Sequence, residues 1–195
     1  MAASIPAQTR GAAFLDRDGT IIRQVELMHK VSQLKLLPGA SDAIRLLNEK
    51  GIPVVVVTNQ PVVARGIASE QDVEHLHQEL NRRLQRRGAH IDAFYFCPHH
   101  PNATLEKYRT RCSCRKPEPG MILQAALEHG IKLSQSVMIG DTTQDVLTGR
   151  QAGTRTILVR TGHGGRDPWQ YECVPDWTAN NLLEAANLWL EASSL

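Results

Sequence analysis

Two carboxylates stand one residue apart near the beginning of the chain, directly after a short apolar run. Asp16 and Asp18 follow residues 12–15 and precede Gly19 and Thr20 in a D-x-D-G-T pattern. Side chains at the carboxyl end of a parallel strand face the crevice where open α/β sheets bind their ligands. Asp16 therefore suits a nucleophile that attacks phosphorus, and Asp18 suits a proton donor and acceptor. Solvated turn residues are the alternative, which the following Gly-Thr pair disfavours.

Three further segments carry groups that a phosphoryl-transfer site needs. The β-branched run at residues 51–57 predicts a strand buried on both faces that ends in Thr58, whose hydroxyl can donate to a phosphoryl oxygen. Lys116 precedes a proline-bounded helix start and can neutralise charge on a bound phosphate. Asp141 follows another buried strand and suits a magnesium ligand. Asp145, four residues on, suits a supporting residue that holds the site in place without binding the metal itself.

Cysteine and histidine form a second constellation between residues 97 and 114. The pair Cys97-x-His99 is separated by twelve residues from Cys112-x-Cys114, which gives three thiolates and one imidazole. This is a normal tetrahedral ligand set for structural zinc, and four protein ligands leave no open position for catalysis. His100 could replace His99, but we predict His99 because Cys-x-His is the tighter spacing. Free thiols or a disulfide are the alternatives.

Taken in order, the segments D-x-D-G-T, hydrophobic-T-N, K-P and G-D-x-x-x-D resemble the four motifs of the haloacid dehalogenase superfamily of phosphotransferases. The fuller pattern D-R-D-G-T, T-N-Q-x-x-x-A-R-G, C-P-H-H-P and C-x-C-R-K-P is similar to the D,D-heptose 1,7-bisphosphate phosphatases and the related histidinol-phosphate phosphatases. This similarity extends over residues 11–162. The twelve residues at 100–111 favour the heptose branch, because the corresponding stretch is much shorter in the histidinol enzymes.

The resemblance implies a two-step mechanism with two metals, magnesium for the chemistry and zinc for the loop. Asp16 would attack the substrate to give an aspartyl-phosphate, and Asp18 would protonate the leaving oxygen and later deprotonate a water molecule. Mg²⁺ would be held by Asp16, Asp141 and the backbone carbonyl of Asp18. Thr58 and Lys116 would stabilise the charge of the phosphoryl group during transfer.

A small sugar phosphate is the substrate that the resemblance implies, with hydrolysis of the C7 phosphate of D-glycero-D-manno-heptose 1,7-bisphosphate as the expected reaction. Arg115 of the C-x-C-R-K-P segment would recognise the substrate, and we place Asn59 and Arg65 in the same substrate-binding role. Histidinol phosphate, another sugar phosphate and a nucleic-acid 3′-phosphate stay open as alternative substrates. A non-catalytic zinc-stapled binding module is the alternative outside enzymology.

Three positions depart from the pattern that is common in the family. Ile22, Pro61 and Thr142 stand where relatives commonly carry Asn, Ser and Lys. All three lie where a sugar or a distal phosphate could be contacted. The departures therefore bear on the choice of substrate and leave the predicted chemistry intact.

Composition and charge fit a single enzymatic domain. The chain has 195 residues, of which 42% are hydrophobic, enough for one well-filled core and short for two. A net charge of +2 is too small to predict a nucleic-acid partner. No signal peptide or membrane span is expected, and cysteines that ligate metal favour a reducing compartment, so we predict a cytoplasmic protein. We expect it to be a monomer.

Strands and helices alternate along the chain, which predicts a three-layer, Rossmann-like α/β fold with a parallel sheet and helices on both faces. The expected strands cover residues 12–15, 51–60, 91–96, 137–140 and 156–160, and the expected helices cover 38–50, 69–88, 121–129, 146–152 and 182–192. We predict one domain over residues 1–195 with no large cap domain, and a zinc loop at about 97–114. His77 is expected on the surface of its helix, and residues 162–165 are expected to form a flexible turn.

Overall fold

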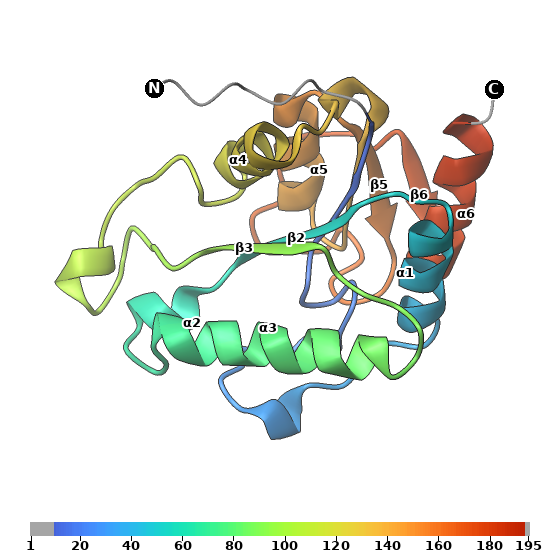
Figure 1. The fold of residues 1–195 in the computed structure, drawn as a ribbon. Coiled ribbons are helices and arrows are strands. Elements are labelled where there is room, and N and C mark those ends of the chain that lie inside the picture. Colours follow the sequence, from blue (N-terminus) through green and yellow to red (C-terminus); the bar gives the residue numbers. More distant parts are fainter. Residues whose placement is uncertain (1–9, 194–195) are drawn as a thin grey trace, which may run out of the picture.

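The computed structural model describes residues 10–193 and contains one six-stranded parallel sheet (Figure 1). The strand order is β3-β2-β1-β4-β5-β6. The strands are β1 (Ala13–Leu15), β2 (Val54–Asn59), β3 (Ala93–Cys97), β4 (Val137–Gly140), β5 (Arg155–Val159) and β6 (Trp177–Ala179). All neighbouring strands pair in parallel, as expected from buried runs without polar alternation.

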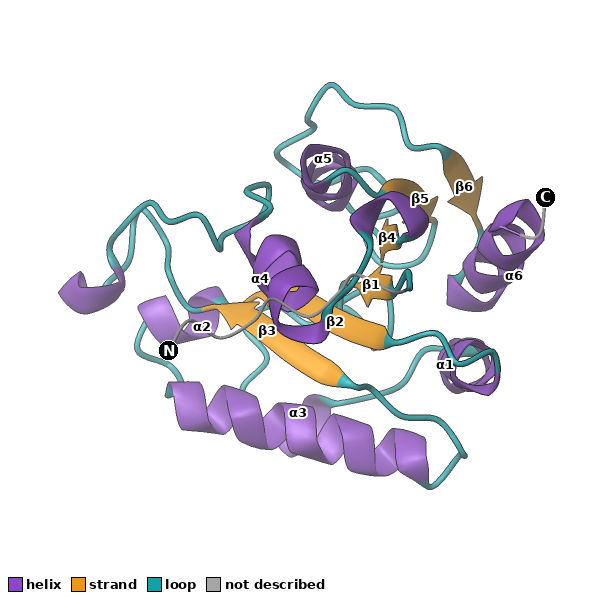
Figure 2. Ribbon diagram, turned by 45° about the horizontal axis from the view of Figure 1, so that its top comes forward, coloured by secondary structure: helices purple, strands orange, loops and turns teal. Residues whose placement is uncertain are grey.

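Helices cover both faces of the sheet, which gives the predicted three layers (Figure 2). One face packs against α1 (Ala40–Glu49), α3 (Glu70–Gln85) and α6 (Leu182–Ser193), whose leucines, alanines and Trp189 join one large core cluster. The other face packs against α4 (Gly120–His129) and α5 (Thr143–Ala152). Short helices complete the described elements: α2 (Pro61–Ala64) and the 3-10 turns η1 (Val31–Gln33), η2 (Glu106–Tyr108) and η3 (Leu133–Gln135).

Local sequence explains where the main helices begin. The Ser69 hydroxyl accepts from the Asp72 backbone at the start of α3, and the Asp72 side chain accepts from the Ser69 backbone. The same capping box forms between Thr142 and Asp145, so α5 begins at Thr143 and not at residue 146 as predicted. The edge strand β6 and the four-residue α2 were not predicted, because segments this short show no measurable periodicity.

The strand order places a ligand crevice between β1 and β4. From β1 the chain builds the sheet outward through β2 and β3 on one side, and through β4, β5 and β6 on the other. Such a switch point is where open α/β sheets bind ligands, outside the carboxyl ends of the strands. Asp16 follows β1 directly and Asp141 follows β4 directly.

No large cap domain interrupts the described elements, in agreement with the prediction. The segment between β3 and α4 projects to one side of the sheet in Figure 1. None of the helices within residues 10–193 is both long and apolar enough to cross a membrane.

Candidate active site

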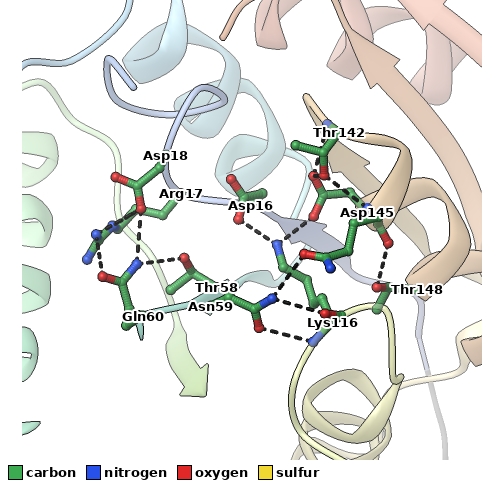
Figure 3. A network of polar contacts seen from close by, with 11 residues as sticks. Asp16, Arg17, Asp18, Thr58, Asn59, Gln60, Lys116, Thr142, Asp145 and Thr148 are labelled. Atoms are coloured by element: carbon green, nitrogen blue, oxygen red, sulfur yellow. Dashed lines mark hydrogen bonds and ion pairs between the residues drawn. The ribbon is translucent and has the colours of Figure 1, made fainter. Parts of the chain in front are cut away.

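The centre of the site is a buried ammonium between two buried carboxylates (Figure 3). Lys116 Nζ lies 2.6 Å from Asp16 Oδ1 and 2.5 Å from Asp145 Oδ1, and the Lys116 residue is only 3% exposed. Asp141 adds a third carboxylate, and oxygen atoms of Asp16, Asp141 and Asp145 lie within 4.8 Å of one another. The structure thus brings together four residues that the sequence places up to 129 positions apart.

Burial controls the electrostatics of this centre. It raises the pKa of Asp16 to about 7, against the attraction of Lys116. Burial and the neighbouring Asp16 raise the pKa of Asp141 to about 8. Burial alone would lower the pKa of Lys116, but the carboxylates of Asp145 and Asp16 raise it above its ordinary value. With one ammonium among three carboxyl groups, Asp16 and Asp141 hold their protons more tightly than ordinary carboxyls, and a further cation beside them would favour their ionised forms.

Asp141 is held by the turn that follows β5. The His163 backbone N–H donates to Asp141 Oδ2 at 2.6 Å, and Gly165 N donates to the Asp141 carbonyl at 2.8 Å. Gly162 and Gly19 both adopt positive φ, and a Cβ on either would overlap the Asp141 carboxylate. The sequence predicts a flexible turn at residues 162–165; the structure has a turn there, and its backbone N–H groups hold a site carboxylate.

The donor set suits magnesium at Asp16 and Asp141. Asp141 Oδ1 is buried without a hydrogen-bond partner in the described chain, which is an unfavourable state for a carboxylate oxygen that no cation approaches. Both oxygens of Asp145 are already engaged, Oδ1 by Lys116 and Oδ2 by the backbone N–H and hydroxyl of Thr142. Hard oxygen ligands of this kind are those that Mg²⁺ prefers.

Thr58 and Asp18 share a neighbour that the sequence analysis did not single out. Gln60 Nε2 donates to Thr58 Oγ1 at 2.9 Å and to Asp18 Oδ2 at 3.0 Å. Because Thr58 accepts from Gln60, its own hydroxyl proton stays available for another acceptor. Gln60 also accepts from Arg17 Nη2 at 2.9 Å.

Asn59 bridges to the lysine segment. Its Oδ1 accepts from the Lys116 backbone N–H at 3.0 Å, and its Nδ2 donates to the Lys116 carbonyl at 3.1 Å and to Gln144 Oε1 at 3.0 Å. The Asn59 side chain, which the sequence analysis predicts to bind substrate, is therefore engaged with the Lys116 backbone. Gln144, another residue that sequence reasoning missed, is 7% exposed and lines the cavities around the site.

A cavity of about 420 Å³ opens beside Asp18. Asp18, Asn59 and His100 line it, and Arg65 and Arg115 supply positive charge to the same cavity. The two arginines predicted to bind substrate thus face the same space as the predicted proton donor. The cavity has room for a small phosphorylated molecule.

The predicted zinc ligands meet in one cluster. Ligand atoms of Cys97, His99, Cys112 and Cys114 lie within 4.8 Å of one another, and the three Sγ–Sγ distances are 3.1, 3.3 and 3.5 Å. Zn–S bonds of about 2.3 Å in tetrahedral geometry would place the sulfurs roughly 3.8 Å apart, whereas a disulfide needs about 2.05 Å; the observed distances are shorter than the first value but nearer to it than to the second. Hydrogen bonding from Cys97 lowers the pKa of Cys114 to about 5, which favours a thiolate.

His99, and not the alternative His100, enters this cluster. His99 Nδ1 lies 3.5 Å from Cys114 Sγ, whereas His100 Nδ1 accepts from the Asn102 backbone N–H. The cluster also touches the site, because Arg115 Nη1 donates to the His99 carbonyl at 2.9 Å. A metal here would fix both the loop and the cation next to Lys116.

The loop has a second anchor that the sequence analysis did not predict. Tyr108 is buried in a small apolar cluster with residues of α2 and α3, and its hydroxyl donates to Glu70 Oε1 at 2.6 Å. Ala103 joins the same cluster. The zinc loop is therefore attached at its base by the cysteines and at its tip by packing.

Comparison with known proteins agrees with this geometry. Residues 13–93 match the family model described as haloacid dehalogenase-like hydrolase, and residues 113–185 match a HAD-hydrolase-like model. The D-glycero-beta-D-manno-heptose-1,7-bisphosphate 7-phosphatase of Yersinia pestis is 38% identical over 178 residues, covering 91% of this chain and 94% of the relative. The enzyme of the same name from Rhodopseudomonas palustris is 45% identical over 153 residues, covering 78% of this chain and 84% of the relative.

The chain belongs to this family of haloacid dehalogenase-like phosphatases.

Solved structures of the family have the same fold. D,D-heptose 1,7-bisphosphate phosphatase from B. bronchiseptica, complexed with magnesium and phosphate, superposes with a TM-score of 0.81 at 30% identity, covering 93% of this chain and 99% of that one. The phosphatase of this name from Burkholderia thailandensis gives a TM-score of 0.67 at 25% identity, covering 92% and 98% of the two chains. The recognised family and fold class are confirmed.

Several residues around the family's site escaped the sequence analysis. The sequence pattern indicates no role for Arg17 or Gln60, and it predicts His77 on the surface of its helix. The surface prediction was wrong, because His77 is only 4% exposed and stacks on Phe94 with a ring separation of 4.6 Å. The one available signal was Arg17 itself, a cation between two aspartates at a strand end.

Proposed function

We propose that this protein is a magnesium-dependent phosphatase that removes the C7 phosphate of D-glycero-D-manno-heptose 1,7-bisphosphate. The observation that carries the proposal is the Asp16 carboxylate held 2.6 Å from the buried Lys116 ammonium, with Asp141 beside it, at the switch point of the sheet. Relatives at 38–45% identity carry this activity in their names. The names of the relatives support the choice of substrate, and the arrangement of Asp16, Lys116 and Asp141 supports the proposed chemistry.

The proposed reaction proceeds in two displacements at phosphorus. In the first, an Asp16 oxygen bonds to phosphorus while the bond to the sugar oxygen breaks, and Asp18 gives that oxygen its proton. In the second, Asp18 takes a proton from water, whose oxygen displaces Asp16. Asp16, Asp141 and the backbone carbonyl of Asp18 would hold magnesium, which would supply positive charge near the phosphoryl oxygens.

Neighbouring groups position and stabilise the phosphoryl group. Lys116 and the free hydroxyl proton of Thr58 would face the equatorial oxygens, where negative charge spreads during transfer. Asp145 keeps Lys116 charged and in place through the contact described above. Asn59, whose amide bonds to the Lys116 backbone, is proposed to position Lys116 in addition to lining the substrate cavity.

The remote phosphate of the substrate is proposed to bind Arg115 and Arg65. Both line the cavity beside Asp18, and Arg115 is fixed through its contact with the His99 carbonyl. Binding of a remote anion can be used to orient the reacting end of a substrate. We therefore expect the enzyme to hydrolyse bisphosphates with a higher kcat/KM than monophosphates.

A panel of phosphate esters with Mg²⁺, scored by released phosphate, tests the function. The heptose 1,7-bisphosphate should exceed heptose 7-phosphate, histidinol phosphate and a 3′-phosphorylated oligonucleotide in kcat/KM. Arg115→Ala should lose about 1.5–3 kcal/mol of transition-state binding for the bisphosphate, as expected for a charge-assisted hydrogen bond. Small monophosphates should be affected little.

Arg86→Ala is the matched control, because Arg86 directly follows α3, its side chain is exposed, and it lines no part of the substrate cavity. It should keep the wild-type preference. Equal efficiency on mono- and bisphosphates in the wild type would refute the heptose assignment and make Ile22, Pro61 and Thr142 markers of another substrate.

We also propose that the enzyme acts as a cytoplasmic monomer. Cysteines that ligate metal support a reducing compartment. The predicted catalytic and magnesium-binding groups of one chain meet in one site, which supports a monomer. Sedimentation of the purified protein at working concentration tests the oligomeric state.

A further inference from the structure

Asp18 is held by buried side chains that the proposed chemistry does not otherwise use. Arg17 Nε and Nη2 lie 3.0 and 2.8 Å from Asp18 Oδ2, and Gln60 Nε2 donates to the same oxygen at 3.0 Å. Asp18 Oδ1 makes no hydrogen bond to any residue in the range 10–193. Three donors fix one oxygen of the carboxylate and leave the other available for a proton (Figure 3).

The Arg17 guanidinium, which supplies two of these three donors, is itself held by other buried side chains. Arg17 Nη2 donates to Gln60 Oε1 at 2.9 Å, and Nη1 lies 3.1 Å from His77 Nε2. Burial, followed by the charge of Arg17, lowers the pKa of His77 well below its usual range, so the neutral ring accepts from Arg17. The stacking of His77 on Phe94 ties this acceptor to α3 and β3.

The placement of Arg17 is unusual for a residue with a structural role alone. Arg17 is 2% exposed, and its only carboxylate partner among the described residues is Asp18. Burying a guanidinium is costly unless its hydrogen bonds are satisfied in good geometry. A well-packed apolar residue of similar volume often gives the folded state the same or greater stability. A planar fork with fixed donors, in contrast, sets the position of a carboxylate more strictly than a flexible ammonium can.

We propose that Arg17, supported by Gln60 and His77, is a positioning residue for Asp18. The three residues hold Oδ2 still, so that Oδ1 is placed to give its proton to the leaving oxygen and later to take one from water. The proposal rests on the proposed function, because it concerns the proton transfers of that reaction. It adds a connection from the active site to α3, which contributes no other group to the site described above.

Dependence on the leaving group separates this role from a general loss of structure. A sugar alkoxide needs the proton of Asp18 to depart, whereas p-nitrophenolate departs without it. In Arg17→Lys, which keeps the charge and loses the fork, kcat/KM for the best sugar phosphate should fall about 100-fold, the size expected for a misplaced catalytic group. The kcat/KM for p-nitrophenyl phosphate should fall less than about threefold, because that constant reports the first displacement alone.

A second readout follows the other half of the reaction. With Asp18 misplaced, water attack on the aspartyl-phosphate slows, so p-nitrophenyl phosphate should give a burst of p-nitrophenol of about one equivalent per active site. Asp18→Asn provides the reference for complete loss of proton transfer. Asp16→Asn should give no burst.

Variants of His77 keep the test decisive if Arg17→Lys does not fold. His77→Leu removes the acceptor for Arg17 and should show the same split at about tenfold, while His77→Gln keeps an acceptor and should stay close to wild type. Equal losses on the two substrates, or no burst in any of these folded variants, would overturn the positioning role. A wild-type protein that hydrolyses no ester would instead overturn the proposed function itself.

Discussion

Replacing Lys116 by Met should destabilise the protein in a way that depends on pH. The ammonium lies 2.6 and 2.5 Å from the carboxylates of Asp16 and Asp145, and at an effective dielectric constant of about 20 each contact is worth roughly 6 kcal/mol before desolvation is subtracted. The desolvation of the buried ammonium offsets much of this gain. Loss of one partner from such a buried pair costs about 3–5 kcal/mol, because the remaining charge is left unpaired.

The raised pKa values of the buried carboxyl groups determine how the loss of stability in Lys116→Met changes with pH. Asp16, with a pKa raised to about 7, is largely ionised at pH 8 and largely protonated at pH 5. A group whose pKa is raised on folding binds more protons in the folded than in the unfolded state, so its cost to stability grows as pH rises from about 4 to 8. Lys116→Met should therefore lose about 3–5 kcal/mol at pH 8 and clearly less, about 2 kcal/mol, at pH 5.

Urea denaturation in magnesium-free buffer measures this difference. Lys132→Met is the matched control, because residue 132 is exposed, and it should change stability by less than about 0.5 kcal/mol at either pH. A loss of the same size at pH 5 and pH 8 would show that Lys116 contributes by packing and not by charge. Restoration of part of the lost stability by Mg²⁺ at pH 8 is also expected, since a bound cation replaces positive charge beside Asp16.

Two further outcomes are expected. Asp16→Asn should fold normally yet lose turnover, because an amide cannot attack phosphorus; residual hydrolysis within about tenfold of wild type, roughly 1.4 kcal/mol of barrier, would rule out Asp16 as nucleophile. Purified protein should hold about one zinc per chain, measured by elemental analysis, and removal of the zinc should lower the melting temperature and increase hydrogen exchange between Cys97 and Cys114. The buried Tyr108 should limit that loosening at the tip of the loop, so uniform exchange over the whole loop would contradict the second anchor.

The sequence alone determined the family, the fold class and the positions of the predicted chemical groups. Buried parallel strands leave continuous apolar runs, so β1, β2 and β4 could be located, and the carboxylates or hydroxyl at their ends could be assigned to one edge of the sheet. Capping signals such as Ser69 and Asp72 mark a helix start with only local residues. The spacing of the cysteines was sufficient for a metal site, because ligand geometry restricts the possible spacings.

Only the tertiary structure decided which buried polar groups are partners. Arg17 contacts His77 across 60 positions of sequence, and Lys116 contacts Asp16 across 100. The turn at residues 162–165 acquires its role from the Asp141 carboxylate that packs against it. Local propensity cannot specify such pairs, since a His on a helix or a Gly-rich turn is compatible with solvent; the demand that every buried donor and acceptor be satisfied acts only once the layers have packed.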